Sequence, residues 1–332
     1  MKQLNILAAR QKGVTLIELL VSVVIGMVIM VAVISAYIGA SSASRTAEAT
    51  GRMNEDAQMA LTILSQQLRM AGVNPSQPNR SSVTVGLNPR GNSVPLHNTL
   101  TNAYAIRGCD IKFSNMTSAA NTGALTCGHA SGSTGPAAIA VAYEADRYNT
   151  VPTSSGAPTD CLGNPIGTTT FNFTNASGVA ASTSVYEAEN RFYIGTSTYI
   201  VNPTLYCKGN GNANGQPLVE NIEDLQITYG TVNPNGGFIY KSQTPTFTAT
   251  QVLGYLSAFN VENDTTTLNG LSNTARWNAV KTVRICVVVR SENAISDSLA
   301  APQYLNCAGV LTTAADKRLR RAYTTTVILR NQ

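Results

Sequence analysis

The sequence predicts an α+β protein in which a long N-terminal helix packs on an antiparallel, β-rich head. Three observations lead to this prediction. An uncharged, mostly apolar stretch fills residues 19–44, and an apolar stripe with helical spacing follows it as far as residue 71. Beyond residue 72, clusters of Asn, Gly, Pro, Ser and Thr alternate with short strand-like runs. We therefore divide the chain into a basic N-terminal segment at 1–13, a helix at 14–72 and a head at 73–332.

The first half of the predicted helix is long enough to cross a membrane, because about 20 apolar residues span the hydrocarbon core of a bilayer. Lys2, Arg10 and Lys12 precede this stretch, and no acidic residue accompanies them. By the positive-inside rule the N-terminus is cytoplasmic, and the chain after Arg45 lies on the far side of the inner membrane. The chain is thus expected to be a single-pass membrane protein.

The second half of the helix is amphipathic. Residues 45–71 contain no proline, and Gly72 and Pro75 end the pattern. A helix from Val14 to Ala71 would extend roughly 85 Å at ~1.5 Å per residue. Its apolar stripe is expected to pack on the head, and it consists of Met53, Ala57, Ala60, Leu61, Leu64, Leu68 and Ala71.

The head has the pattern of strands and loops, with no repeat and no linker that would divide it. The alternation typical of a half-buried strand is clearest in the last two predicted strands. The predicted strands are Ala137–Tyr143, Asn190–Ile194, Thr198–Tyr206, Leu225–Tyr229, Val280–Arg290 and Tyr323–Leu329.

One acidic residue, Glu18, stands at the edge of the apolar run. An ionised side chain costs up to ~2.5–3.5 kcal/mol if it is carried to the centre of a bilayer, so such a residue is expected to have a function and a partner. It ends the stretch Lys12-Gly13-Val14-Thr15-Leu16-Ile17-Glu18.

This stretch resembles the class-III signal of type IV pilins, in which a basic leader ends in Gly and is followed by an apolar residue, Thr-Leu-Ile-Glu and an apolar helix. The usual first mature residue is Phe, and here it is Val14. The resemblance implies that a prepilin peptidase cuts after Gly13, that Val14 becomes N-methylated, and that Glu18 guides entry into a filament. Pairing of the new amine with Glu18 would offset the cost of ionised groups inside a filament core.

Two other interpretations of the N-terminus remain open. Glu18 could simply extend to the lipid headgroups. Alternatively, the segment could be a Sec signal peptide with cleavage near the small residues Ser41 to Ser44, although its apolar region is long for that class. The N-terminus of the mature protein distinguishes these interpretations.

Three blocks of the C-terminal half resemble PilW-type minor pilins. They are Leu218 to Gly230, the region from Trp277 through Val280–Ile285 to Ser291, and Arg321 to Asn331. The resemblance implies a structural, non-catalytic subunit that primes pilus assembly and joins the pilus tip complex, with roles in adhesion and twitching motility. Expected partners are other minor pilins, the major pilin, the prepilin peptidase, the inner-membrane assembly platform and a PilY-type tip adhesin. Minor pseudopilins of type II secretion, the J type, share a related pattern and are the alternative.

Six cysteines all lie beyond the membrane segment, and their even number in an exported region favours three disulfides. Six cysteines allow 15 pairings. We predict pairing between sequence neighbours, because each bond would close a hairpin or loop: Cys109–Cys127, Cys161–Cys207 and Cys286–Cys307.

The sequence contains no recognisable catalytic constellation. Its two histidines, His97 and His129, lie in loop-like settings, and no phosphate-binding loop is present. Residues 209–215 are rich in Gly and Asn but lack carboxylates, so we interpret them as a turn and not a calcium loop. Glu220, Glu223 and Asp224 are interpreted as a solvated or capping group. We expect no metal and no cofactor, and an alternative as a membrane-tethered periplasmic enzyme has little support.

Composition agrees with this expectation. Charged residues make up only 12% of the chain, well below the usual quarter, and uncharged polar residues replace them. The formal net charge is +5, and the three leader cations account for more than half of it. The remaining chain has no electrostatic footprint for nucleic acid.

Overall fold

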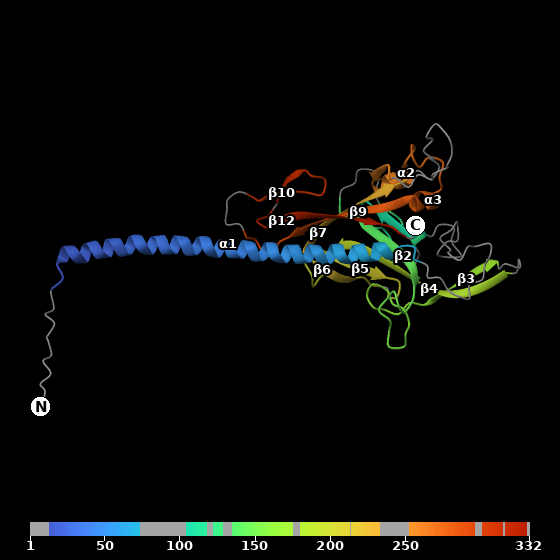
Figure 1. The fold of residues 1–332 in the computed structure, drawn as a ribbon, viewed down its shortest axis with the longest axis horizontal. Coiled ribbons are helices and arrows are strands. Elements are labelled where there is room, and N and C mark those ends of the chain that lie inside the picture. Colours follow the sequence, from blue (N-terminus) through green and yellow to red (C-terminus); the bar gives the residue numbers. More distant parts are fainter. Residues whose placement is uncertain are drawn as a thin grey trace, which may run out of the picture. The chain divides into compact units, whose positions relative to one another are not determined.

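The computed structural model describes residues 13–73, 104–117, 122–128, 135–174, 180–212, 214–232, 252–295, 301–314 and 316–330. The chain divides into two compact units, Met1–Ala49 and Thr50–Gln332. Helix α1, Leu16–Met70, contributes to both units (Figure 1). Among the described residues it is the one helix long and apolar enough to cross a membrane, and it agrees with the prediction from sequence to within two residues at each end.

The C-terminal part of α1 belongs to the head. Its buried side chains are those of the predicted stripe, except that Leu61 is only partly buried. The helix ends because Gly72 adopts a positive φ of 68°, which glycine tolerates best. The backbone N–H of Gly72 then donates to the carbonyl of Ala142 at 2.9 Å, so the end of the helix is tied directly to a strand of the head.

The larger of the two main sheets is antiparallel and has the order β1-β2-β4-β5-β6, with β3 paired to β4. Tyr186 of β4 pairs with Ala145 of β2 and also with Thr168 of β3, so β2 and β3 lie on opposite edges of β4. The strands are β1 (Ile106–Cys109), β2 (Ala138–Ala145), β3 (Thr168–Thr174), β4 (Ala180–Gly195), β5 (Thr204–Gly209) and β6 (Gln216–Glu220).

The second main sheet is also antiparallel and has the order β12-β9-β7-β8. Its strands are β7 (Ile222–Thr231), β8 (Gly254–Leu256), β9 (Val280–Arg290) and β12 (Arg320–Ile328). A small hairpin pairs β10 (Gln303–Leu305) with β11 (Leu311–Thr313). The short helices are η1 (Thr122–Ala124), α2 (Ala258–Asn263) and α3 (Asn273–Asn278).

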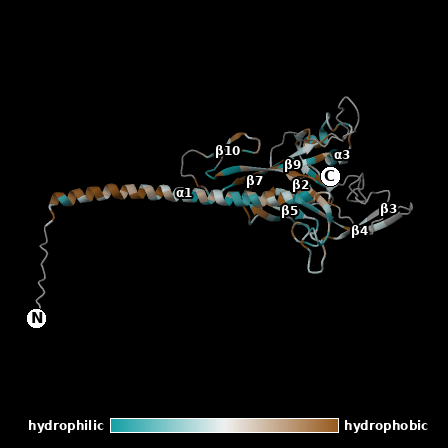
Figure 2. Ribbon diagram, in the orientation of Figure 1, coloured by the Kyte–Doolittle hydropathy of each residue, from teal (hydrophilic) through white to brown (hydrophobic). Residues whose placement is uncertain are grey.

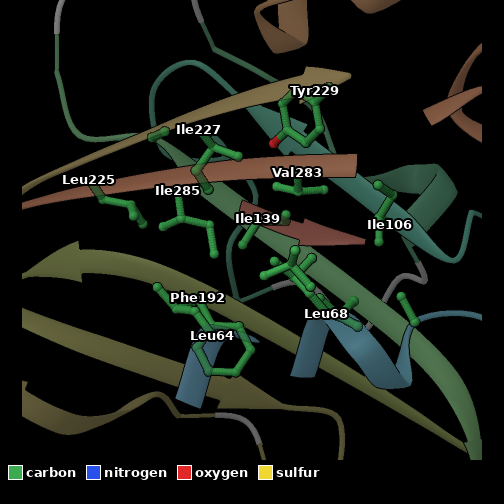
Figure 3. Close-up of a cluster of buried hydrophobic side chains, with 14 of the residues drawn as sticks. Leu64, Leu68, Ile106, Ile139, Phe192, Leu225, Ile227, Tyr229, Val283 and Ile285 are labelled. Carbon is green, nitrogen blue, oxygen red and sulfur yellow. The ribbon is translucent and has the colours of Figure 1, made fainter. Parts of the chain in front are cut away.

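The core of the head forms where the C-terminal part of α1 meets the two sheets. Figure 3 shows Leu64 and Leu68 of α1 beside Phe192 and Ile139 of the larger sheet, with Leu225 and Ile285 of the other sheet close by. Each of these six side chains is at most 1% exposed. Burial of this kind contributes about 1.5–3 kcal/mol per large apolar side chain, so the helix and both sheets form one hydrophobic unit.

Five of the six predicted strands are present as β2, β4, β7, β9 and β12. The predicted strand Thr198–Tyr206 is wrong over most of its length, because regular pairing begins only at Thr204. Ser197 and Ile200 instead form a turn, in which the N–H of Ser197 donates to the carbonyl of Ile200 at 2.9 Å. Pro203 follows and has no N–H to donate to a neighbouring strand.

Candidate processing and assembly site

The N-terminal part of α1 presents apolar side chains that the protein itself does not cover. From Val14 to Ile38 the exposed fraction of the large apolar side chains ranges from 45% at Val23 to 80% at Leu16. Figure 2 shows the ribbon of this stretch mostly in the brown of hydrophobic residues. Because burying apolar area is favourable by roughly 25 cal/mol per Å², such a surface must be covered by lipid or by neighbouring helices.

The helix begins with a capped first turn built from the motif residues. The backbone N–H of Glu18 donates to Thr15 Oγ1 at 3.4 Å, and the N–H of Leu19 donates to the carbonyl of Thr15 at 3.1 Å. Thr15 is therefore the N-cap, and Glu18 occupies the third helical position, which is the spacing of a capping box. A carboxylate in the first turn is also stabilised by the helix dipole.

Gly13 and Val14 precede the helix, and both are exposed. A side chain added at Gly13 would meet no atom within 4 Å, and φ at this position is not in the left-handed region. The folded chain itself therefore does not require glycine there. A requirement for glycine at residue 13 would have to come from a protein that acts on this segment.

Lys2, Arg10 and Lys12 of the predicted leader lie outside the described residues, as do His97 and His129. The structure thus places Gly13, Val14 and Glu18 at the start of α1, whereas residues 1–12 of the leader lie outside the described ranges.

The six cysteines form three disulfides, with the pairing of sequence neighbours: Cys109–Cys127, Cys161–Cys207 and Cys286–Cys307. The first closes a loop over η1 and the second joins the start of a loop to β5 in the core. The third ties the β10–β11 hairpin region to β9. All six cysteines are therefore used in bonds that cross-link loops of the head.

Of the acidic residues Glu220, Glu223 and Asp224, the last two have defined hydrogen-bond partners. Glu223 receives two hydrogen bonds from the Arg320 guanidinium, at 2.5 and 3.0 Å, and is therefore an ion-pair partner and not a solvated side chain. Asp224 accepts the N–H of Leu225 at 2.9 Å, and burial raises the pKa of its carboxyl. Glu220 remains exposed.

The glycine-rich stretch acts as a close-packed turn around Asp160. The N–H of Gly211 donates to Asp160 Oδ2 at 3.0 Å, and a Cβ at Gly209 would overlap the same side chain. Asp160 also accepts the N–H groups of Leu162 and Asn164. Within the described ranges, no group of three or more His, Cys, Asp or Glu side chains is arranged to hold a metal ion.

A buried charged layer on the larger sheet was not anticipated from the sequence. Glu187, Glu189 and Arg191 alternate along β4 and are all less than 7% exposed. Arg191 pairs with Glu189 at 2.7 Å, and its guanidinium also donates to the carbonyl of Met116. The pattern Glu-x-Glu-x-Arg in residues 187–191 could have indicated this buried layer. Charged residues in a strand, however, ordinarily indicate a face exposed to solvent. The contacts with the 109–127 loop give this layer a structural role.

Comparison with known protein families gives two matches. Residues 8–34 match the prokaryotic N-terminal methylation motif, and residues 191–331 match PilW, the type IV pilus-assembly protein W. The second match runs from the C-terminal part of β4 to the end of β12 and includes the whole second sheet. No curated protein and no solved structure gives a significant match. With the methylation motif at the start of an uncovered apolar helix and a PilW match over residues 191–331, the chain has the features of a type IV pilin-like protein, and its head is similar to PilW.

Proposed function

We propose that this protein is a minor type IV pilin that helps to initiate pilus assembly and sits in the pilus tip complex. The observation that carries the proposal is the combination, on one helix, of the motif Gly13–Glu18 and the exposed apolar surface that follows it. That surface fits a bilayer before assembly and fits neighbouring helices in a filament afterwards. The role is structural, without catalysis.

In this proposal, a prepilin peptidase cuts between Gly13 and Val14, and Val14 is then N-methylated. The released amine lies close to Glu18 along the chain and can be neutralised by the Glu18 carboxylate of the same or an adjacent subunit. The capped first turn supports this role, because it fixes the backbone position of Glu18 at the entrance to the helix.

The proposed partners are other minor pilins, the major pilin, the inner-membrane assembly platform and a PilY-type tip adhesin. The proposed location is the inner membrane before assembly and the periplasm or extracellular pilus afterwards. The match of residues 191–331 to PilW, the type IV pilus-assembly protein W, supports pilus assembly over secretion.

The test is a gene deletion in which sheared surface pili and secreted exoenzymes are measured in the same strain. We expect loss of pili with normal secretion. The wild-type gene should restore pili, Glu18→Ala should not, and Glu55→Gln, a change at an exposed position of the same helix, should restore them. Loss of secretion with normal pili would reject the proposal and assign the protein to a type II secretion system.

A further inference from the structure

Strand β12 lies at the edge of its sheet, and among the described residues no strand pairs with its outer side. It pairs with β9 along its whole length, from Arg320 opposite Arg290 to Ile328 opposite Thr282, and it is the terminal strand of its sheet. The N–H of Leu329 donates to the carbonyl of Lys281, and the N–H of Ser291 donates to the carbonyl of Leu319. In an antiparallel ladder these bonds alternate, so odd-numbered residues of β12 bond to β9 and even-numbered residues face away from it.

The outward-facing backbone groups belong to Ala322, Thr324, Thr326 and Ile328. Within the described parts of the chain, none of these four residues has a backbone partner on the outer edge. The side chains of Thr324, Thr326 and Ile328 are exposed, with Ile328 at 65%. Contact with the β10–β11 hairpin is near the Arg320 end, where Arg320 lies over the Tyr304 ring at 5.9 Å. A row of free donors and acceptors therefore extends over about seven residues.

Three of the other sheet edges carry features that hinder pairing with another chain, whereas β12 and the seven-residue edge strand β3 do not. Strand β6 contains Pro217, β8 has three residues and β1 has four. Short edges and edge prolines are the usual protections against strand addition. Strand β12 has nine residues and contains neither proline nor lysine. Residues 323–328 are Tyr, Thr or β-branched apolar residues, which favour extended structure.

Arginines bracket this edge and indicate what can bind there. Arg321 and Arg330 are exposed near the two ends of the strand. Arg284 is exposed opposite Thr326 on β9, but its guanidinium lies over the Tyr255 ring of β8 at 4.1 Å and so is directed away from the outer edge of β12. In the region that the structure describes, no ion pair includes any of these three. Two copies of β12 paired antiparallel about a two-fold axis would bring the Arg321 end of each strand against the Arg330 end of the other. The charges thus disfavour a second copy and favour an acidic strand.

We propose that the outer edge of β12 binds an extended, acidic segment of a different polypeptide, which adds to the sheet as a further strand. Backbone hydrogen bonds to residues 322, 324, 326 and 328 supply the affinity. Carboxylates on the added strand pair with Arg321 and Arg330, which are nine residues apart and lie roughly 30 Å from each other at ~3.4 Å per residue. This inference does not depend on the proposed role in pilus assembly.

The test uses the full chain in detergent and two fluorescein-labelled peptides, each with four Thr-Val repeats. One peptide has glutamate at both ends and the other has lysine. Fluorescence anisotropy should show that the glutamate peptide binds at least about tenfold more tightly, and that the difference shrinks in high salt.

Substitutions then separate edge pairing from charge attraction. Thr326→Pro removes an outward N–H, which an edge position tolerates, and should weaken binding about tenfold, whereas Thr326→Ala keeps the N–H and should bind like the wild type. The double variant Arg321→Glu and Arg330→Glu should prefer the lysine peptide. Circular dichroism of each variant checks the fold.

Three results would each overturn the proposal. They are equal binding of both peptides, unchanged binding by a folded Thr326→Pro variant, and dimers of the chain that Thr326→Pro dissociates.

Discussion

At the residue scale, Gly108 of β1 is the position least able to accept a side chain. A Cβ there would overlap the hydroxyl of Tyr229, a side chain that is fully buried and packs edge-on against Trp277 at 5.0 Å. Among the residues that the structure describes, the Tyr229 hydroxyl has no hydrogen-bond partner. Close packing, and not a turn, is therefore the reason for this glycine.

We predict that Gly108→Ala lowers the free energy of unfolding by about 1–3 kcal/mol or more, because overpacking displaces a strand or the Tyr229 ring. Gly254→Ala, in a strand position where an added Cβ meets nothing within 4 Å, is the matched control and should change stability little. Urea unfolding measures both. Tyr229→Phe removes an unsatisfied hydroxyl, so it should be near neutral alone and should recover part of the loss in the double variant. Full independence of the two substitutions would contradict this explanation.

Glu187 in β4 is a second residue with a testable consequence. Burial, followed by the nearby carboxylates Glu189 and Glu144, raises the pKa of its carboxyl from 4.5 to about 8. Within the described part of the chain, the Glu187 Oε2 atom has no hydrogen-bond partner. The folded protein therefore keeps this group protonated over a range in which the unfolded chain ionises it.

The sign of the pH effect follows from that difference. The contribution of Glu187 to stability is fully present below pH 4.5 and is lost as the pH rises to about 8. We predict that Glu187→Gln flattens this decline, so that its urea midpoint exceeds that of the wild type at about pH 9 but not at about pH 5. Glu189→Gln should instead destabilise at both pH values, because it leaves Arg191 without its ion-pair partner. An identical pH profile for Glu187→Gln and the wild type would show that Glu187 has an ordinary pKa.

At the scale of elements, the C-terminal part of α1 holds the two sheets together through a narrow stripe. Leu64 is 1% exposed, whereas Met59 on the same helix is 56% exposed. We predict that Leu64→Ala costs about 2–5 kcal/mol of unfolding free energy, while Met59→Ala stays within about 0.5 kcal/mol. Thermal or urea unfolding of the two variants measures the contrast. Similar losses in both would mean that the stripe does not face the core.

The elements that could be predicted from sequence are those with a clear period. The stripe on α1 has helical spacing, and β9 and β12 alternate in the way that half-buried strands do. The sequence reveals little about the start of β4, which is built from Ala, Ser and Thr with no apolar alternation. Strand β3 was missed although Phe171 and Phe173 alternate with Asn172, because only three of its seven residues form that pattern. Helices α2 and α3 were missed because each has only six residues, although their N-caps Ser257 and Ser272 were a usable signal.

At the scale of the whole molecule, sequence was most informative about the N-terminal site. Gly13, Val14 and Glu18 are adjacent in sequence, so no knowledge of the fold was needed to place them together. The head presents the opposite case. The buried charges on β4 and the outer edge of β12 depend on which strands are neighbours, and that pairing joins residues about 30–70 positions apart, as in Ile222 with Val289.

A substitution at Gly13 can distinguish a requirement of the fold from a requirement of the peptidase that would recognise this segment. Since the space around Gly13 is open, Gly13→Leu should leave the fold and membrane anchoring unchanged. It should nevertheless block cleavage, because only an external peptidase would require glycine at this position. Mass spectrometry of the purified protein should then find the uncut chain, whereas the wild type and Glu18→Gln should begin at an N-methylated Val14. A wild-type N-terminus at Ser44 would instead identify a Sec signal peptide, and normal cutting of Gly13→Leu would place the recognition elsewhere in the segment.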